Sequence, residues 1–580
     1  MPSLSIASVV VFAVYCVGSL LWRHLRHRLL RRQTCVLDLE QLGLSRSVDQ
    51  KIRGTAVICG GSLAGLFTAR VCHDHFDEVV IVEPEVWADR PDAQRQDAWN
   101  QENTRSRIVQ YESLHGISPV VPVSAYLPNG YQVPYNDLPS WHCAIFLQTL
   151  QKNARHQIYC TCSIHWLPLF NDVFSSIGPA DHVVSTWGRW SKKPYDQYNG
   201  VLPDSMTASR RGFETLLRRL VLGGGHKNIR QVIGTVTGIS RSASNPEYLD
   251  RVTIRTTAGT REIDAALVVG AASAGMKWLR REGYGQSDTY PSGKLPLNEL
   301  KIAYDQKIVY STVKLHVPPE LGDRLPGLPA PFDECGLIYA CIADPVLDCR
   351  GITLQRIEGN LVQICCAVFG AGELPQTLEQ IKKYAQSIVT RVPILLWFFQ
   401  ILDMLDEVED TMACSQVPFA GASYIRFDKA VSLPPNWIAI GDSVMKVNPL
   451  FGQGIVKALM GAICLNTLLQ KRDATAGIPK DFSAEFFETQ GNKISPFWDA
   501  DKVWDYGYHT TVPIAGEKLA DSWFLRWYTR QLIKLSFDDV QVGSILWHVN
   551  MQLAPPIDAM HPGIVLKVLW ATVKGFFVTE

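Results

Sequence analysis

The chain has 580 residues, enough for one large domain or two closely joined domains with a substantial core. Lysine plus arginine and aspartate plus glutamate number 56 each, so the charge balance gives no reason to expect a nucleic-acid partner. The 14 cysteines form no Cys-x-x-Cys pair, which favours reduced, buried thiols, and His73 and His75 would point apart on a helix, which argues against a metal pair.

An uncharged apolar stretch begins at Leu4 and ends at Trp22. As a helix it would be about 28 Å long at 1.5 Å per residue, which is enough to span a bilayer. A basic block follows it directly, with arginines at 23, 26, 28, 31 and 32, so the positive-inside tendency places the body of the protein in the cytosol. The alternative is a cleaved signal peptide, but the charges follow the apolar run and no small-residue cleavage pattern precedes them.

Residues 57–65 and 79–83 predict a strand, a glycine turn, the start of a helix and a second strand that ends in an acid. In such a unit Gly60 allows a tight turn, Gly61 or Ser62 lets the backbone approach a pyrophosphate, and Gly65 lets the helix pack close to the sheet. Glu83 lies near the position expected for a carboxylate that binds a ribose hydroxyl. Ser62 replaces the usual middle glycine, so a plain glycine-rich turn is the alternative for this segment alone.

The middle of the chain has the pattern of a β-sheet. Predicted strands cover residues 231–239, 252–257, 261–269, 307–316 and 361–368, separated by polar or glycine-containing turns. This region is the natural substrate domain. Residues 393–402 are the best candidate for an apolar pocket lining, with Trp397 and Phe398 among them, although ordinary core is the favoured interpretation.

A second informative segment covers residues 438–455. A short apolar strand leads into Gly441-Asp442, then into a turn that contains Pro449, and then into a long apolar helix that begins near Gly454. A carboxylate at a strand end can hold a polyol chain. Backbone amides at a helix start can stabilise negative charge that develops on an electron-rich ring.

The tail, residues 484–580, is rich in aromatic residues and is predicted to be helical. Residues 563–578 are apolar except for Lys567, Thr572 and Lys574, which suits a helix lying on a membrane surface, but packing against the body is an equal alternative. At about 16 residues this segment is short for a second span.

The glycine turn, Glu83 and the segment from Gly441 to Ile455 together resemble the FAD-binding motifs of single-component flavoprotein monooxygenases, notably fungal enzymes that oxidise natural products and, more distantly, squalene epoxidase. The resemblance implies an α/β fold: a Rossmann-type FAD-binding domain, an inserted mixed β-sheet substrate domain and a helical C-terminal region, here with an N-terminal transmembrane helix added. It also implies FAD as the cofactor and NAD(P)H as the reductant.

The same resemblance assigns cofactor contacts along the chain. Glu83 would hold the adenosine ribose and Asp442 the ribitol, and Arg107 and Arg210 resemble arginines of the family's FAD-binding part. For these two, a surface arginine or a structural ion pair is an even alternative. The full set of implied cofactor-binding residues is Gly60, Gly61, Ser62, Gly65, Glu83, Arg107, Arg210, Asp442, Pro449, Gly452, Gln453, Gly454 and Ile455.

One position departs from the family pattern. Many relatives carry an acid where this chain has Ala272, in a region near the pyrophosphate and the path of the nicotinamide donor. Asp264 lies too early in the chain to replace it. The departure puts the reductant in doubt more than it does the binding of FAD.

The resulting hypothesis is a membrane-anchored, FAD-dependent monooxygenase that inserts one atom of O2 into a lipophilic natural product such as a terpenoid, a prenylated aromatic or a polyketide, with its body on the cytosolic side of the endoplasmic reticulum. No catalytic side chain, metal ion or nucleic acid is implied. The expected parts are an anchor (1–32), an FAD-binding part (50–230), a mainly substrate-binding part with a returning strand near 267 (231–435), a second FAD-binding segment (436–483) and a helical region (484–580).

Three alternatives stay open. A flavin-dependent dehydrogenase or reductase would share both motifs. A flavin-binding membrane scaffold without turnover would fit the missing acid at Ala272. A flavin halogenase is disfavoured because the chain has no Trp-x-Trp-x-Ile-Pro element.

Overall fold

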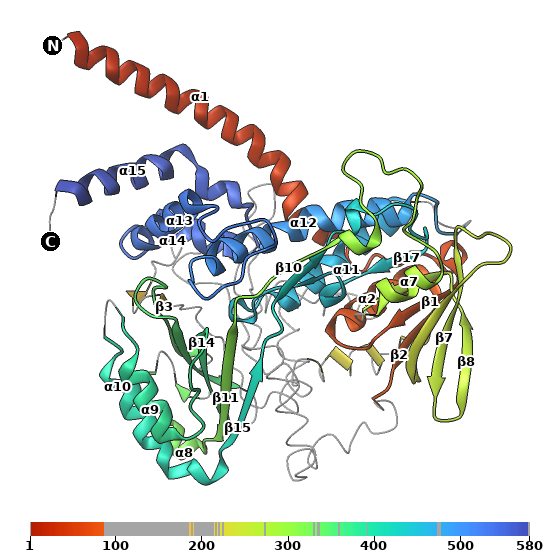
Figure 1. Cartoon of the computed structure of the whole chain (residues 1–580), viewed down its shortest axis with the longest axis horizontal. Coiled ribbons are helices and arrows are strands. Elements are labelled where there is room, and N and C mark those ends of the chain that lie inside the picture. The colour runs from red at the N-terminus through yellow and green to blue at the C-terminus, as the bar shows by residue number, and fades with distance from the viewer. Residues whose placement is uncertain are drawn as a thin grey trace.

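The structure is a computed structural model. It describes residues 2–85, 185–186, 189–190, 214, 217–218, 221–222, 226–271, 274–328, 331–332, 337–357, 360–390, 393–472, 477–550 and 552–577. Within these residues the fold is mixed α/β, with four sheets and a largely helical C-terminal region (Figure 1).

A five-stranded parallel sheet forms the first layer, in the order β17-β9-β1-β2-β5. Its strands are β17 (Trp437–Ala439), β9 (Leu267–Gly270), β1 (Ile52–Cys59), β2 (Phe76–Glu83) and β5 (Ile229–Ile233). Apolar runs such as residues 56–59 and 79–82 are fully buried, as a parallel sheet covered on both faces requires. Helix α2 (Leu63–His75) packs on β1 and β2, and α11 (Gly454–Lys471) packs on α2.

A small antiparallel sheet shares the core of the first layer. It contains β6 (Thr235–Arg241), β7 (Leu249–Thr256) and β8 (Gly259–Asp264), and α7 (Gly275–Arg281) follows β9. The predicted strand 231–239 is wrong as one element, because Gly234 divides it into β5 and β6, which belong to different sheets. A Cβ at Gly234 would lie 2.8 Å from the carbonyl oxygen of Arg255, so this close crossing requires glycine.

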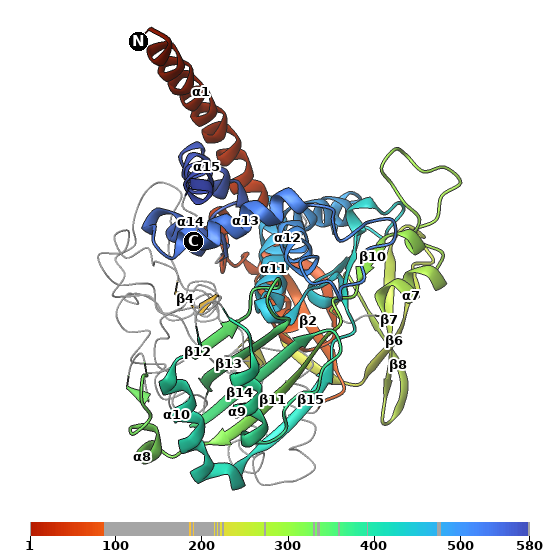
Figure 2. The same ribbon diagram turned by 60° about the vertical axis from the view of Figure 1, so that its left-hand side comes forward.

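The largest sheet has seven strands in the order β15-β11-β14-β13-β12-β3-β4, antiparallel except for the β12–β3 pair. The strands are β3 (Ser185–Thr186), β4 (Arg189–Trp190), β11 (Ile308–His316), β12 (Leu337–Ile342), β13 (Arg350–Ile357), β14 (Leu361–Phe369) and β15 (Ala413–Pro418). Figure 2 shows α9 (Leu378–Ser387) and α10 (Leu396–Met404) lying against one face, with α8 (Pro319–Gly322) near the sheet end. Phe398, Ile401 and Leu402 of α10 are buried in that interface as ordinary core, whereas Leu396 of the same segment is exposed.

A three-stranded sheet and the C-terminal helices complete the body. The sheet contains β10 (Lys301–Tyr304), β16 (Ala422–Ile425) and β18 (Met445–Lys446), and the helices are α12 (Phe482–Asp505), α13 (Trp523–Ser536), α14 (Val540–Asn550) and α15 (Pro562–Phe577). The predicted helical tail is confirmed for these four helices, whereas residues 506–522 between α12 and α13 form turns.

The first helix, α1 (Pro2–Gln33), projects from the body and has α15 beside it in both ribbon views (Figures 1 and 2). Trp22 Nε1 donates to the carbonyl of Ile557 at 3.0 Å, and Arg26 Nε donates to Asp558 Oδ1 at 2.8 Å. No helix within the searched part of the described chain is long and apolar enough to cross a membrane. The predicted span from Leu4 to Trp22 includes residues 4–9 and 11–12, whose side chains lie outside the described residues, so the span stays a prediction.

Trp437 anchors β17, the strand that leads to Asp442. Its side chain is fully buried and packs edge-on against Phe427, with ring centroids 5.1 Å apart, and close to Gly275. We expect Trp437→Ala to lower the free energy of unfolding by about 3–5 kcal/mol, because it leaves a large cavity beside the parallel sheet. Trp437→Phe should cost less, since the indole N–H has no hydrogen-bond partner among the described residues. Urea titration followed by circular dichroism measures both changes, and equal stability of the alanine variant and the wild type would contradict this account.

Candidate functional site

The carboxyl ends of four parallel strands meet at one edge of the five-stranded sheet. Cys59 of β1 pairs with Val82 of β2 and with Gly270 of β9, and Gly270 pairs with Ala439 of β17. Ligands of open α/β sheets bind at such an edge, outside the carboxyl ends of the strands. The structure thus brings the two predicted segments to the same edge.

The early glycine turn leaves β1 and enters α2. Gly60 has a φ of +119°, a backbone conformation that favours glycine, and Ser62 is the N-cap residue of α2. A Cβ on Gly65 would lie 2.0 Å from the carbonyl oxygen of Gly60 and 3.3 Å from Cγ2 of Ile58. Only glycine at position 65 therefore allows the helix to approach the turn this closely.

Glu83 ends β2 beside this turn. Its Oε2 accepts a hydrogen bond from the backbone N–H of Gly61 at 2.9 Å, and its Oε1 accepts one from Glu85 at 3.3 Å. Burial raises the pKa of Glu83, and the hydrogen bonds from Gly61 and Glu85 oppose that shift. The strand end thus presents a carboxylate next to the first N–H groups of α2, which have no partner within that helix.

The later segment lies directly against the first turn of α2. Gly441 has a φ of +73°, and a Cβ there would lie only 2.9 Å from the Cβ of Ala64. Ser443 fixes the turn, because its hydroxyl donates to the carbonyl of Gly270 at 2.7 Å. Asp442 therefore emerges beside the N-terminus of α2, although nearly 380 residues separate the two in the chain.

Residues 448–454 form a tight turn that we call the 448–454 loop. Asn448 caps a short 3-10 helix (Pro449–Phe451), since its Oδ1 accepts from the backbone N–H of Leu450 at 3.0 Å. Gly452 follows with a φ of +66° in the left-handed region, and Gln453 is the N-cap residue of α11. Ile455 lies buried in the first turn of that helix. The first amides of α11 have no partner within the helix, which makes this end an electropositive surface.

A lysine that the sequence analysis missed lies under this segment. Lys457 has only 1 % of its side chain exposed, and its Nζ donates to Asp442 Oδ1 at 2.9 Å and to the carbonyl of Met445. The Asp442 side chain is 41 % exposed, so it faces the open side of the site while Lys457 holds it from the buried side.

The 448–454 loop also contacts the seven-stranded sheet. Leu450 packs against a buried cluster made of Ile308, Tyr310, Cys365, Ala367, Phe369 and Tyr508. The rings of Phe369 and Tyr508 stack with centroids 3.7 Å apart. Sheet and loop together therefore give the site an apolar wall.

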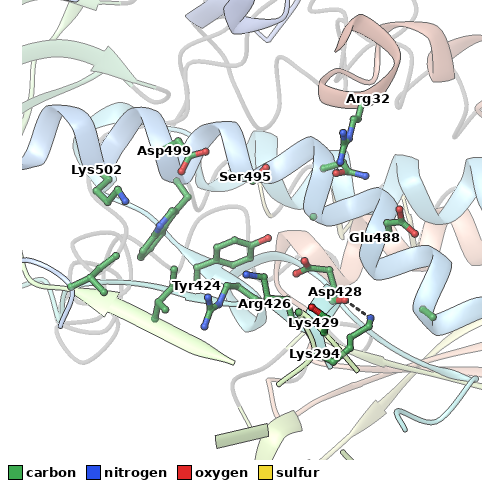
Figure 3. Close-up of a pocket in the computed structure, with 18 of the residues that line it drawn as sticks. Arg32, Lys294, Tyr424, Arg426, Asp428, Lys429, Glu488, Ser495, Asp499 and Lys502 are labelled. Carbon is green, nitrogen blue, oxygen red and sulfur yellow. Dashed lines mark hydrogen bonds between the residues drawn. The ribbon is translucent and has the colours of Figure 1, made fainter. Parts of the chain in front are cut away.

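A separate cavity of about 680 Å³ lies along another face of α12 (Figure 3). Tyr424 and Trp498 line it, and Asp428, Asp499 and Lys502 are among its charged residues. Lys294 Nζ donates to the backbone carbonyl of Asp428 at 2.8 Å, as the dashed line marks. Of the predicted cofactor-binding residues that the structure describes, none lines this cavity.

Three positions of the sequence analysis cannot be placed in this site. Arg107, Arg210 and Ala272 lie outside the described residues. Within the described residues, no cluster of three or more histidines, cysteines, aspartates and glutamates is arranged to hold a metal ion.

No protein-family profile and no curated protein matches the sequence. Solved structures give weak similarities. A flavin-dependent brominase, Bmp2, aligns with 12 % identity and a TM-score of 0.48 over 90 % of this chain and 99 % of its own. A p-nitrophenol 4-monooxygenase from Pseudomonas putida aligns with 13 % identity and a TM-score of 0.47 over 87 % and 99 %. An anhydrotetracycline hydroxylase from Streptomyces rimosus aligns with 13 % identity and a TM-score of 0.46 over 86 % and 76 %.

Proposed function

We propose that the chain is an FAD-dependent monooxygenase. One observation carries the proposal: Gly441 packs against Ala64, which brings Asp442 to the N-terminus of α2 at the carboxyl edge of a parallel sheet. That edge is where a dinucleotide is bound in folds of this kind. The 448–454 loop and the apolar wall of the seven-stranded sheet lie alongside.

The residues of the site fit the cofactor. A Cβ placed on Gly452 or Gly454 would meet no atom within 4 Å, so the described chain leaves open space in front of the loop. Oε1 of Gln453 is buried and has no hydrogen-bond partner among the described residues. Open space in front of helix amides that have no partner within their own helix is what a flavin edge with several hydrogen-bonding groups would fill.

In this proposal the amides at the start of α2 bind the pyrophosphate, Glu83 binds the adenosine ribose and Asp442 binds the ribitol. Amides around Gly452 and Ile455 face the pyrimidine side of the flavin ring. When bound and reduced, FAD supplies the activation of O2 and the transfer of one oxygen atom.

The protein side chains have a positioning role in this scheme. The first amides of α11 stabilise negative charge near the ring through the positive end of the helix dipole. Leu450 and the aromatic pair Phe369 and Tyr508 keep water away from the loop. We assign no general base.

We further propose a lipophilic substrate, NAD(P)H as reductant, and anchoring in the endoplasmic reticulum membrane by residues 1–32. Exposed apolar side chains on two neighbouring helices support a membrane location: Leu20 and Leu21 on α1, and Leu566 and Trp570 on α15. Such side chains suit a lipid surface better than water.

The test begins with the purified full-length chain. We expect visible flavin absorption and, in the presence of NAD(P)H and a lipophilic acceptor, one atom of isotopically labelled O2 in the product. A protein that remains free of flavin after reconstitution with FAD contradicts the proposal. For the anchor, we expect the full chain to sediment with membranes and a chain that lacks residues 1–32 to do so much less.

The alternatives predict different results in the same experiments. A dehydrogenase or reductase would oxidise its substrate without incorporating labelled oxygen. A flavin-binding scaffold would show the flavin spectrum without substrate-dependent oxidation of NAD(P)H.

A further inference from the structure

Two buried carboxylates lie beneath the 448–454 loop and have no part in the proposed chemistry. Asp501 and Asp505 are four residues apart on α12, so they lie on the same side of that helix. Asp501 is 2 % exposed and Asp505 is fully buried. Neither belongs to the motifs that the sequence analysis identified.

Asp505 holds Asn448, and Asp501 lies close by. The side-chain Nδ2 of Asn448 donates to Asp505 Oδ1 at 2.7 Å, and the Asn448 N–H lies near enough to Asp501 to lower the pKa of that carboxyl. The hydroxyl of Tyr304 donates to the second oxygen of Asp505 at 2.9 Å. Asn448 Oδ1 also accepts from the backbone N–H of Leu450 and so caps the turn. The position of the whole 448–454 loop therefore depends on the contacts that hold Asn448.

The charges of this buried cluster do not balance when every carboxylate is ionised. Asp501 and Asp505 lie near one ammonium group among the described side chains, that of Lys457, which is committed to the more exposed Asp442 and to a carbonyl. Oδ2 of Asp501 has no hydrogen-bond partner among the described residues. A buried, unpartnered, ionised oxygen is costly, so a proton on the pair is the cheaper state.

The surroundings of the two carboxyl groups also favour the protonated form, because they raise both pKa values. Burial raises the pKa of Asp505 to about 7, although hydrogen bonds from Asn448 and Tyr304 oppose the shift. Burial and the nearby Asp505 raise the pKa of Asp501, against Lys457 and the Asn448 N–H. The titratable and charged groups around the pair are Tyr304 on β10, Lys457 on α11 and Tyr508 after α12.

We propose that Asp501 and Asp505 hold a single proton between them, and that this proton keeps the 448–454 loop in the conformation that binds FAD. The two aspartates are then positioning residues, and the inference rests on the proposed function. Loss of the proton leaves two buried negative charges in proximity. Their repulsion is relieved only when the pair separates or water enters, and either movement releases Asn448.

The sign of the pH dependence follows from this arrangement. Asp505 titrates near pH 7 while the loop is in place, whereas a pair released into water titrates nearer the ordinary carboxyl range. Between these two pKa values FAD binding takes up a proton, and above about pH 7 both states have lost it. The dissociation constant of FAD should therefore increase with pH, by at most about tenfold per unit, because one proton is coupled to binding.

The experiment measures the FAD dissociation constant of the full-length protein between about pH 5 and pH 8, which covers the approach to the titration of Asp505 and the region above it, after removal of bound flavin and with flavin fluorescence as the readout. The wild-type dissociation constant should rise with pH up to about 7 and level off above it. Asp505→Asn should bind FAD with little change over this range, because the amide can still accept from Asn448 while Tyr304 turns to accept from it.

Two further variants separate the inference from a general structural effect. Tyr304→Phe removes a donor to Asp505 and should move the loss of affinity to higher pH. This variant tests the inference even if Asp505→Asn does not fold. Asp499→Asn makes the same change on the same helix, but Asp499 faces the separate cavity of Figure 3 and burial raises its pKa too, so its profile should match the wild type.

The outcomes are distinguishable. A wild-type affinity that does not change with pH, an unchanged slope in Asp505→Asn, or a slope lost equally in Asp499→Asn overturns the inference while leaving FAD binding intact. A wild type that binds no FAD at any pH removes the proposed function and this inference together.

Discussion

Replacing Gly65 by alanine is expected to weaken FAD binding by roughly 100-fold. The added Cβ would lie 2.0 Å from the carbonyl oxygen of Gly60, and a backbone carbonyl cannot rotate away as a side chain can. The turn has to open, which also breaks the hydrogen bond from Gly61 to Glu83. Overpacking of about 3 kcal/mol corresponds to a loss of affinity of roughly 100-fold. The purified variant should lack the flavin spectrum, and titration with FAD gives the size of the loss.

Gly491→Ala is the matched control. Gly491 also lies in a helix, but a Cβ there would meet its nearest neighbours at 3.5 Å, an ordinary van der Waals distance. This variant should bind FAD as the wild type does and gain slightly in helix stability. If Gly65→Ala retains its flavin as firmly as Gly491→Ala does, the early glycine turn is not part of the cofactor site.

Replacing Lys457 by methionine is expected to destabilise the fold and to lower the flavin content. Methionine fills a similar volume but removes the charge that pairs with Asp442 and that lowers the pKa of the nearby Asp501. Removing one partner of a buried ion pair costs about 3–5 kcal/mol. The low end applies, because Asp442 is 41 % exposed and can take up water. Urea titration gives the change in the free energy of unfolding.

The control for this prediction is an exposed ion pair between a lysine and a glutamate. Lys383 bonds Glu379 at 2.7 Å one helical turn away, but the two side chains are 72 % and 77 % exposed. Lys383→Met should change the free energy of unfolding by less than about 0.5 kcal/mol. Equal effects of the two lysine replacements would show that Lys457 contributes no more than a surface charge.

The elements that bracket the site were predictable from the sequence. Each motif combines a short apolar run with a glycine at a turn of positive φ, as at Gly60 and Gly441. Such a local sequence pattern predicts the strand and the turn without knowledge of the rest of the fold. The strands predicted near residues 307–316 and 361–368 also correspond closely to β11 and β14.

The predicted strand boundaries were wrong where the chain passes from one sheet to another. The predicted strand 261–269 is divided at Ala265 and Ala266 into β8, which is antiparallel to β7, and β9, which belongs to the parallel sheet. Alternation of apolar side chains reports only that a segment is extended. It does not report which neighbour the segment pairs with.

The supporting residues of the site could not be predicted. Lys457, Asp501 and Asp505 come from two helices, and their partner Tyr304 comes from a strand about 200 residues away in the chain. A lysine in the first turns of an apolar helix and two acids one turn apart are ordinary sequence features. Their structural role arises only from the contacts that they make in the folded protein.

The separation of β1 from β17 has a consequence for biosynthesis. Nearly 380 residues must leave the ribosome after β1 before β17, the strand that leads to Asp442, exists, which takes roughly 20–80 s at typical elongation rates. Until then the sheet lacks an outer strand, and the surface of α2 that α11 later covers is bare. The nascent chain should therefore bind chaperones for most of its translation and bind FAD only afterwards.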